Sequence, residues 1–120
     1  MPRFVVLEHK HQGVHWDFML ESSGVLRTWR LEQAPECGAA VPATPLSDHR
    51  IIYLDYEGEI SGGRGSVRRW DMGEFEWLEN AADVIAVRLA GGRCGGVAYL
   101  RKLASGDWEF KLTPSDSAPS

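Results

Sequence analysis

The sequence HKHQGVHWDFMLE, residues 9–21, contains a strand pattern from which the fold can be argued. Successive side chains of a strand point to opposite faces. One face of residues 14–21 would carry Val14, Trp16, Phe18 and Leu20, and the other His15, Asp17, Met19 and Glu21. An imidazole and a carboxylate two residues apart therefore lie side by side, opposite a strongly apolar face.

Three of the four histidines, His9, His11 and His15, fall within this stretch. The short connector containing Gly13 could fold one of the first two back toward His15 and Asp17. Two imidazoles and one carboxylate form a three-ligand site suited to Mn(II), Fe(II) or Zn(II). The spacing leaves open which histidine binds, and a solvated outer face without a metal is the alternative interpretation.

Length and composition predict a single globular domain. The chain has 120 residues, 43% of them hydrophobic, which is enough for a packed core without disulfides. Cys37 and Cys94 lie far apart and outside any CxxC pair, so both are expected to be free thiols. A net charge of −4 argues against binding long duplex nucleic acid through overall charge, but it allows a local phosphate pocket.

No signal-peptide pattern and no membrane-length apolar run occur in the sequence. We therefore expect a cytoplasmic protein that does not contact membranes.

Further strands are predicted along the chain. Residues 3–8 form one, and residues 25–31 pair with residues 14–21 as a hairpin that brings Arg27 or Arg30 near the candidate site. Strands are also expected at residues 67–73, ending in a turn at Gly73, and at 97–103 and 108–112. Residues 75–78 are a short apolar run, and 81–90 favour a strand over a short helix.

Residues 32–48 are rich in Pro, Ala and Gly and are predicted to form a long surface loop. Alternation in residues 49–60 then places His49, Tyr53 and Asp55 on one side, where His49 and Tyr53 could approach a shared centre. The alternative is a half-buried sheet tyrosine and a histidine at a loop end.

A glycine-rich stretch at residues 61–66 could cradle a phosphate with backbone N–H groups, although a tight connection is the commoner role. Arg64, Arg68 and Arg69 form the densest basic patch, and arginine suits bidentate phosphate recognition. A charged edge strand is the alternative interpretation.

Many short strands separated by turns predict an all-β fold: a small closed or partly open β-barrel of mainly antiparallel strands. The barrel domain would span residues 1–113, and residues 114–120 would be a disordered tail. Several strands of such a barrel converge on one mouth, where we expect a metal and a phosphate to meet.

Six stretches match the motifs of a known family in order: residues 4–9 (FVVLEH), 14–21 (VHWDFMLE), 26–33 (LRTWRLEQ), 47–61 (SDHRIIYLDYEGEIS), 63–73 (GRGSVRRWDMG) and 107–112 (DWEFKL). This pattern resembles the 3′-phosphoesterase domain found at the N-terminus of bacterial DNA ligase D and in related stand-alone proteins. The resemblance implies a small β-barrel that binds Mn(II) and removes a 3′-terminal phosphate, or a terminal ribonucleotide in stages, from a DNA primer end.

By position, the resemblance implies that His9, His15 and Asp17 are the metal ligands, so that His11 is an extra residue. His49 would contact the phosphate, and Tyr53 matches a site tyrosine. The implied partners are 3′ ends of DNA or RNA-tailed DNA, with ligase or polymerase supplied by separate proteins if the chain stands alone.

Several phosphate-binding positions depart from the family pattern. The family's arginine two residues after the metal aspartate is replaced by Met19, and its lysine at the end of the motif at 26–33 is replaced by Gln33. Its acidic residue two positions before the site histidine is replaced by Ser47. The family's arginine in the preceding loop has no counterpart, because no basic residue occurs at 37–44. Each lost charge-assisted contact costs about 1.5–3 kcal/mol. Arginines that could compensate are Arg27, Arg30, Arg50, Arg64, Arg68 and Arg69, and all of them except Arg50 are assigned as candidate phosphate-binding residues. A module that binds phosphorylated nucleic-acid ends without turnover is therefore an alternative, as is a small-molecule Fe(II) enzyme.

Overall fold

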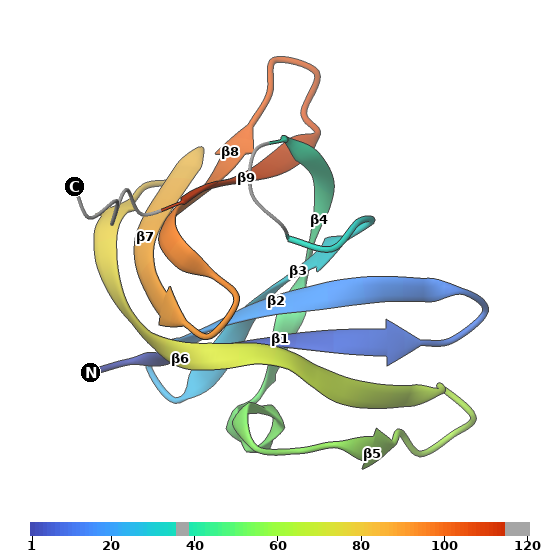
Figure 1. The fold of residues 1–120 in the computed structure, drawn as a ribbon. Helices are drawn as coiled ribbons and strands as arrows, with labels where there is room; N and C mark the ends of the chain where they lie inside the picture. Colours follow the sequence, from blue (N-terminus) through green and yellow to red (C-terminus); the bar gives the residue numbers. More distant parts are fainter. Residues whose placement is uncertain (36–38, 115–120) are drawn as a thin grey trace.

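A computed structural model describes residues 1–35 and 39–114, and it confirms the all-β prediction. Eight antiparallel strands close into a barrel, and a ninth short strand extends it (Figure 1). The elements are β1 (Arg3–Lys10), β2 (Val14–Ser22), β3 (Val25–Leu31), β4 (Val41–Arg50), the 3₁₀ helix η1 (Ile51–Leu54), β5 (Gly58–Glu59), β6 (Ser66–Asn80), β7 (Val84–Gly91), β8 (Gly95–Lys102) and β9 (Trp108–Pro114).

Pairing of β1 with both β2 and β6 closes the barrel, whose strand order is β1-β2-β3-β4-β9-β8-β7-β6. The predicted β2–β3 hairpin is confirmed, with Ser22 opposite Val25. Closure leaves fewer exposed edges than an open sheet of the same strands. β5 pairs only with β6, outside the closed ring.

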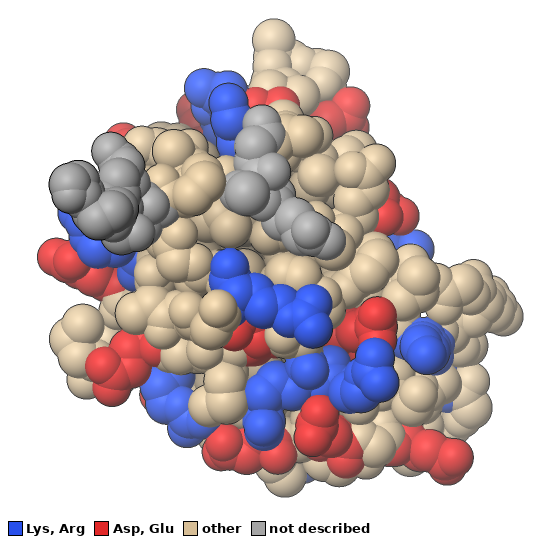
Figure 2. All heavy atoms as spheres, in the orientation of Figure 1, with Lys and Arg blue, Asp and Glu red and all other residues tan. Residues whose placement is uncertain are grey.

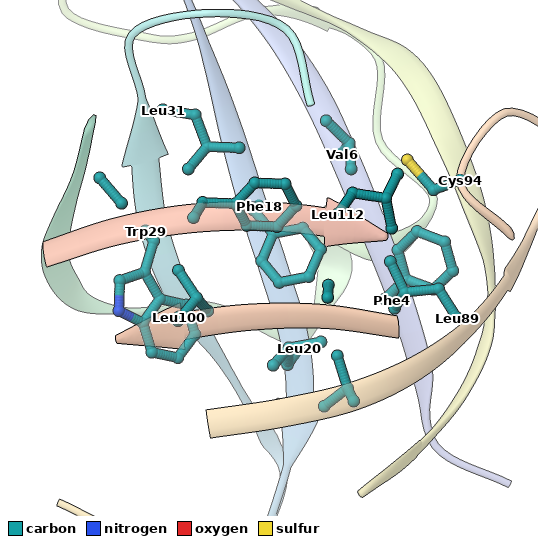
Figure 3. Packing of buried hydrophobic residues seen from close by; sticks show 14 of the residues in the cluster. Phe4, Val6, Phe18, Leu20, Trp29, Leu31, Leu89, Cys94, Leu100 and Leu112 are labelled. Atoms are coloured by element: carbon teal, nitrogen blue, oxygen red, sulfur yellow. The ribbon is translucent and has the colours of Figure 1, made fainter. Parts of the chain in front are cut away.

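Alternation along the strands produces two separate apolar clusters. The inner cluster fills the barrel with side chains from all eight strands, including Phe4, Phe18 and Leu100 (Figure 3). The second cluster contains Val5 and Met19, which alternate with the inner residues and therefore lie on the outer wall. Segment 51–60 covers this cluster, because Leu54 packs within it and Tyr53 and Ile60 against it.

The predicted loop at residues 32–48 is wrong for residues 41–48, which begin strand β4. Val41 and Ala43 are buried, whereas Pro42 and Thr44 are exposed, so the alternation is present but carried by weak strand formers. Pro45 is tolerated because it lies beyond the three residues through which β4 joins β9, so that one edge of β4 is unpaired there. Cys37 lies outside the described residues.

Two other boundaries differ from the prediction. β6 continues through Gly73 and includes residues 75–78, so no turn interrupts it. Gly73 is required there for close packing, since a Cβ atom would lie 2.1 Å from the Ala90 carbonyl oxygen. The strand predicted at 81–90 is confirmed as β7. β9 extends through Pro114, one residue into the predicted tail, and residues 115–120 lie outside the described residues.

No helix among the described residues is long and apolar enough to cross a membrane.

Candidate metal centre

His9, His15 and Asp17 meet near the turn end of the β1–β2 hairpin. His9 lies directly opposite His15 in the antiparallel register, and Asp17 follows two residues later on the same face of β2. Gln12 and Gly13 both adopt positive φ angles of 54° and 115° in the connecting turn, which reverses the chain tightly. Strand register and strand period together therefore bring the three side chains together.

The three side chains form a compact cluster. One ligand atom from each residue lies within 4.8 Å of the others. His9 Nδ1 is 3.4 Å from Asp17 Oδ2, and His15 Nε2 is 3.1 Å from Asp17 Oδ1. The side chains of His15 and Asp17 are 9% and 5% exposed, so solvent reaches the cluster mainly past His9, at 18%.

The Asp17 carboxylate indicates that this cluster fits a cation. Its Oδ1 atom is buried, and no described residue donates a hydrogen bond to it, although His15 Nε2 is near. An unpaired buried carboxylate oxygen is costly. A cation between the carboxylate and the two imidazoles would satisfy it, and two nitrogens with one oxygen suit a divalent transition metal.

The hydrogen bond of His9 determines which of its ring nitrogens can bind the metal. His9 Nε2 lies 2.7 Å from the Arg64 carbonyl oxygen. A carbonyl only accepts, so Nε2 carries the proton and Nδ1 presents a lone pair toward Asp17. The ligand atoms would be Nδ1 of His9 and Nε2 of His15.

A cavity of about 100 Å³ opens beside the cluster, lined by His9 and Asp17 together with His49, Tyr53 and Arg64. His49 and Tyr53 therefore both line this cavity, as one of the two interpretations of the sequence allowed. The reason differs from the predicted strand alternation: His49 lies near the end of β4, and Tyr53 is in the 3₁₀ turn that follows. Their rings meet edge to face at 5.9 Å.

Two contacts stabilise the segment around the 3₁₀ helix, which carries Tyr53 and follows His49. His49 Nδ1 donates to the Ser47 carbonyl oxygen at 2.9 Å, which leaves Nε2 as the free ring nitrogen. Arg3 on β1 pairs with Asp55 at 2.8 Å, just after the 3₁₀ helix. The hydrogen bond from the Arg3 guanidinium lowers the pKa of the exposed Asp55 carboxyl below its usual value.

The site lies on the outer wall and not at a barrel mouth as expected. His9 and Asp17 share a face with the second cluster, and the rest of the cavity lining is apolar: Leu7, Met19, Ile60 and Val67. The inner face of the same strands is filled with apolar side chains, so only the outer face has room for a polar centre. Segment 51–65 is therefore the second wall of the site (Figure 1).

Three of the five candidate phosphate-binding arginines line the cavity or share the site's face by register: Arg64, Arg30 and Arg69, but the Arg69 side chain lies near Asp55 and not at the cluster. Arg64 lines the cavity, and its Nε donates to the Ser61 carbonyl oxygen at 2.8 Å. Arg30 lies opposite Asp17 in the β2–β3 register and therefore shares its face. Its guanidinium pairs with Glu32 at 2.9 Å, so an anion would compete with that carboxylate.

The structure does not bring the side chains of Arg27, Arg68 and Arg69 to the cluster. Arg27 faces the opposite side of β3, beside the rings of Trp29 and Trp77, and donates to Asn80 at 2.9 Å. Arg68 points away from Val67, the cavity residue before it, and pairs with Glu8 at 3.0 Å. Arg69 is close enough to Asp55 to lower its pKa further, after Arg3.

Charges of both signs cover the surface around these elements. Figure 2 shows Lys and Arg side chains in a band across one face, with Asp and Glu side chains interspersed and along its lower border.

Sequence reasoning missed the backbone carbonyl of Arg64 and the apolar walls from Ile60 and Val67. A carbonyl has no side-chain signal, and the glycines around Arg64 indicated a turn or a phosphate cradle. A strand was predicted at residues 67–73, but which of its faces would be covered depended on segment 51–60.

Comparison with known proteins agrees with this geometry. Residues 7–114 match the family model described as the DNA ligase D 3′-phosphoesterase domain. The chain is 35% identical to the multifunctional non-homologous end joining protein LigD of Pseudomonas aeruginosa over 83 residues, which are 65% of the chain and 10% of that protein.

Similar relatives occur in mycobacteria. The LigD protein of Mycobacterium bovis is 32% identical over 114 residues, covering 88% of the chain and 15% of that protein. The Mycolicibacterium smegmatis protein is 35% identical over an alignment of 140 residues, covering 98% of the chain and 18% of the relative. The chain thus spans less than a fifth of these relatives. On the family match and the mycobacterial identities, this chain belongs to the DNA ligase D 3′-phosphoesterase domain family.

Proposed function

We propose that this domain is a metal-dependent phosphoesterase that acts at 3′ ends of DNA. The observation that carries the proposal is the largely buried His9–His15–Asp17 cluster, whose Asp17 Oδ1 has no described hydrogen-bond partner, beside a cavity that His49 also lines. Metal ligands next to a candidate proton donor are the combination that phosphoester hydrolysis needs.

His9, His15 and Asp17 would hold Mn(II), the metal implied by the family resemblance. The donor set also accepts Fe(II) or Zn(II). When bound, such a cation supplies Lewis-acid polarisation of a phosphoryl oxygen. The apolar cavity walls exclude water around the ion and so strengthen its interaction with a phosphate.

His49 would provide the hydrogen bond to the phosphate. Because Nδ1 donates to Ser47, the ring is oriented and Nε2 remains free for a phosphoryl oxygen or, when protonated, for the departing 3′ oxygen. Tyr53 would support this position through its edge-to-face contact and could donate its hydroxyl.

Arg64 and Arg30 are the arginines we assign to phosphate binding. Arg64 lines the cavity, and Arg30 lies beside Asp17 on the adjacent strand. Both now donate to the protein, Arg64 to Ser61 and Arg30 to Glu32, so each would exchange a weak surface contact for a phosphate contact.

The substrate would be a DNA end bearing a 3′-phosphate or a terminal ribonucleotide. Relatives are named for non-homologous end joining, so we place the reaction in end processing during DNA repair. Ligase and polymerase activities would come from other domains or from separate proteins.

The test is phosphate release from a 3′-phosphorylated primer-template with Mn(II), with His15→Ala as the control. We expect release by the unsubstituted protein and none by the variant, whose metal site lacks one ligand. Equal release by both proteins would rule out the assigned centre.

A binding module without turnover is the second candidate, and the cavity wall favours it. Leu7 and Met19, both 1% exposed, form apolar walls where further charged contacts to a phosphate would otherwise be available. In that case the same primer-template would bind tightly in an electrophoretic mobility assay, and no phosphate would appear on long incubation.

A further inference from the structure

The glycine-rich turn at residues 61–65 packs directly against the end of β1. Gly65 adopts φ +83°, and a Cβ atom at this position would lie 1.9 Å from the Lys10 carbonyl oxygen and 2.8 Å from His11 Cβ. Ile60 N donates to the Gly65 carbonyl oxygen at 2.8 Å, which closes the turn. Only glycine allows the turn to lie this close to the strand that carries His9.

The same close approach places a carbonyl on a metal ligand. Arg64, which precedes Gly65, accepts the Nε2–H of His9 at 2.7 Å. The Arg64 side chain folds back to Ser61, donating to its carbonyl oxygen at 2.8 Å, but the seat of the turn is set by its backbone at Ile60 and Gly65. The turn is thus held at both ends and presents its Arg64 carbonyl in a fixed direction.

We propose that the 61–65 turn is the positioning element of the metal centre: seated by Gly65, it uses the Arg64 carbonyl to fix the tautomer and direction of the His9 ring. This inference rests on the proposed metal-dependent function. Without the carbonyl, His9 could place its proton on either nitrogen, and the Nδ1–H form has no lone pair to offer on the Asp17 side.

Outer hydrogen bonds of this kind typically change metal affinity by about 10–100-fold. The turn therefore has a role that its composition did not indicate. Its glycines need not cradle a phosphate, because at least one is required for packing against β1.

The matched variants are Gly65→Ala and Gly63→Ala. Both positions have positive φ, +83° and +68°, so both alanines strain the turn, but a Cβ at Gly63 meets no atom within 4 Å. We expect Gly65→Ala to weaken Mn(II) binding about 10–100-fold by titration calorimetry, and Gly63→Ala to stay within about twofold of the unsubstituted protein.

The tautomer is read separately, by ¹⁵N chemical shifts of the histidine rings in metal-free protein. We expect His9 as Nε2–H in the unsubstituted protein and in Gly63→Ala, and a mixture in Gly65→Ala. A predominant Nδ1–H form in the unsubstituted protein would overturn the inference even if Gly65→Ala did not fold. Equal affinity of Gly65→Ala and the unsubstituted protein would also overturn it.

These outcomes separate the two proposals. An unsubstituted protein that binds no Mn(II) contradicts the proposed function, whereas the ring shifts still decide whether the turn fixes His9. Binding that is unchanged in Gly65→Ala contradicts the positioning role alone.

Discussion

The inner and outer faces of the β1–β2 hairpin contrast in composition although alternate residues of the same two strands form them. Phe18 is fully buried among apolar side chains from the other strands (Figure 3). Its neighbour Asp17 faces outward with two histidines. Packing on the inner face depends on the volumes of its side chains, whereas the candidate metal site on the outer face depends on the positions of its polar atoms. Alternation along a strand therefore allows the chemistry to change with little effect on the barrel.

Met19 illustrates this separation. It stands where the family resemblance implies an arginine, and it is 1% exposed in the second cluster, packed with apolar neighbours beneath segment 51–60. The outer wall thus holds an apolar residue near the candidate metal ligands, while the inner face of the same strand is also apolar.

Asp17→Asn should give the largest functional effect with little effect on stability. Asparagine keeps the size but loses the charge that offsets a divalent cation, so we expect Mn(II) affinity to fall at least about 100-fold. Titration calorimetry and thermal unfolding would measure the two properties. Glu21→Gln is the control, because Glu21 lies on the same face of β2 as Asp17 but four residues further along the strand and outside the cluster.

Undiminished Mn(II) affinity in Asp17→Asn, or a loss of equal size in Glu21→Gln, would contradict the assigned ligand set.

Phe18→Ala should do the opposite and unfold the barrel. Removing a fully buried ring costs about 3–5 kcal/mol in the free energy of unfolding. Urea denaturation would measure the loss. Val14→Ala, on the same strand but 45% exposed, should change stability by no more than about 0.5 kcal/mol. Similar losses in both variants would argue against the burial of Phe18 in the inner cluster.

Gly73→Ala should cause a smaller loss, because it tests backbone packing between β6 and β7. The added methyl would lie 2.1 Å from the Ala90 carbonyl oxygen and force the strands apart, at a cost of about 1–3 kcal/mol. Gly95→Ala is the matched control, since a Cβ there meets no atom within 4 Å. Denaturation midpoints that shift equally would show that β6 is not held as tightly as this contact requires.

Cys94 should give the smallest effect, seen only at alkaline pH. Burial raises the pKa of its thiol far above the ordinary 9.0, with a further contribution from nearby Asp71. Below pH 9 the thiol is neutral in both states, so its contribution to stability is fully present. Above pH 9 the unfolded thiol ionises first, and the free energy of unfolding falls by up to about 1.4 kcal/mol per pH unit.

Urea denaturation of the unsubstituted protein and Cys94→Ala between pH 8 and 10 isolates this term. Stability should fall more steeply with pH in the unsubstituted protein, and parallel slopes would contradict the burial effect.

The sequence predicted the barrel class and the clustering of His15 with Asp17, because strand alternation is a local property of residues 14–21. It did not predict β4, whose prolines and small residues weaken the alternation and whose pairing depends on distant β9. The placement of the site on the outer wall was also unpredictable, since it depends on segment 51–60 covering one face and not the other.

The arginines show the same limit. Basic composition alone pointed to five arginines as candidate phosphate-binding residues. Which of them approach the site depends on the strand face that each occupies and on its ion pair, and both depend on strand register. Arg27 and Arg68 lie on the opposite faces of β3 and β6 from the cavity side, which composition could not reveal.

The most direct test is a crystal soaked with Mn(II) and measured near the manganese absorption edge. We predict one anomalous peak about 2.0–2.4 Å from His9 Nδ1, His15 Nε2 and an Asp17 oxygen. No peak at this position, or a peak bound by other residues, would contradict the claim that the outer-wall cluster is the metal centre.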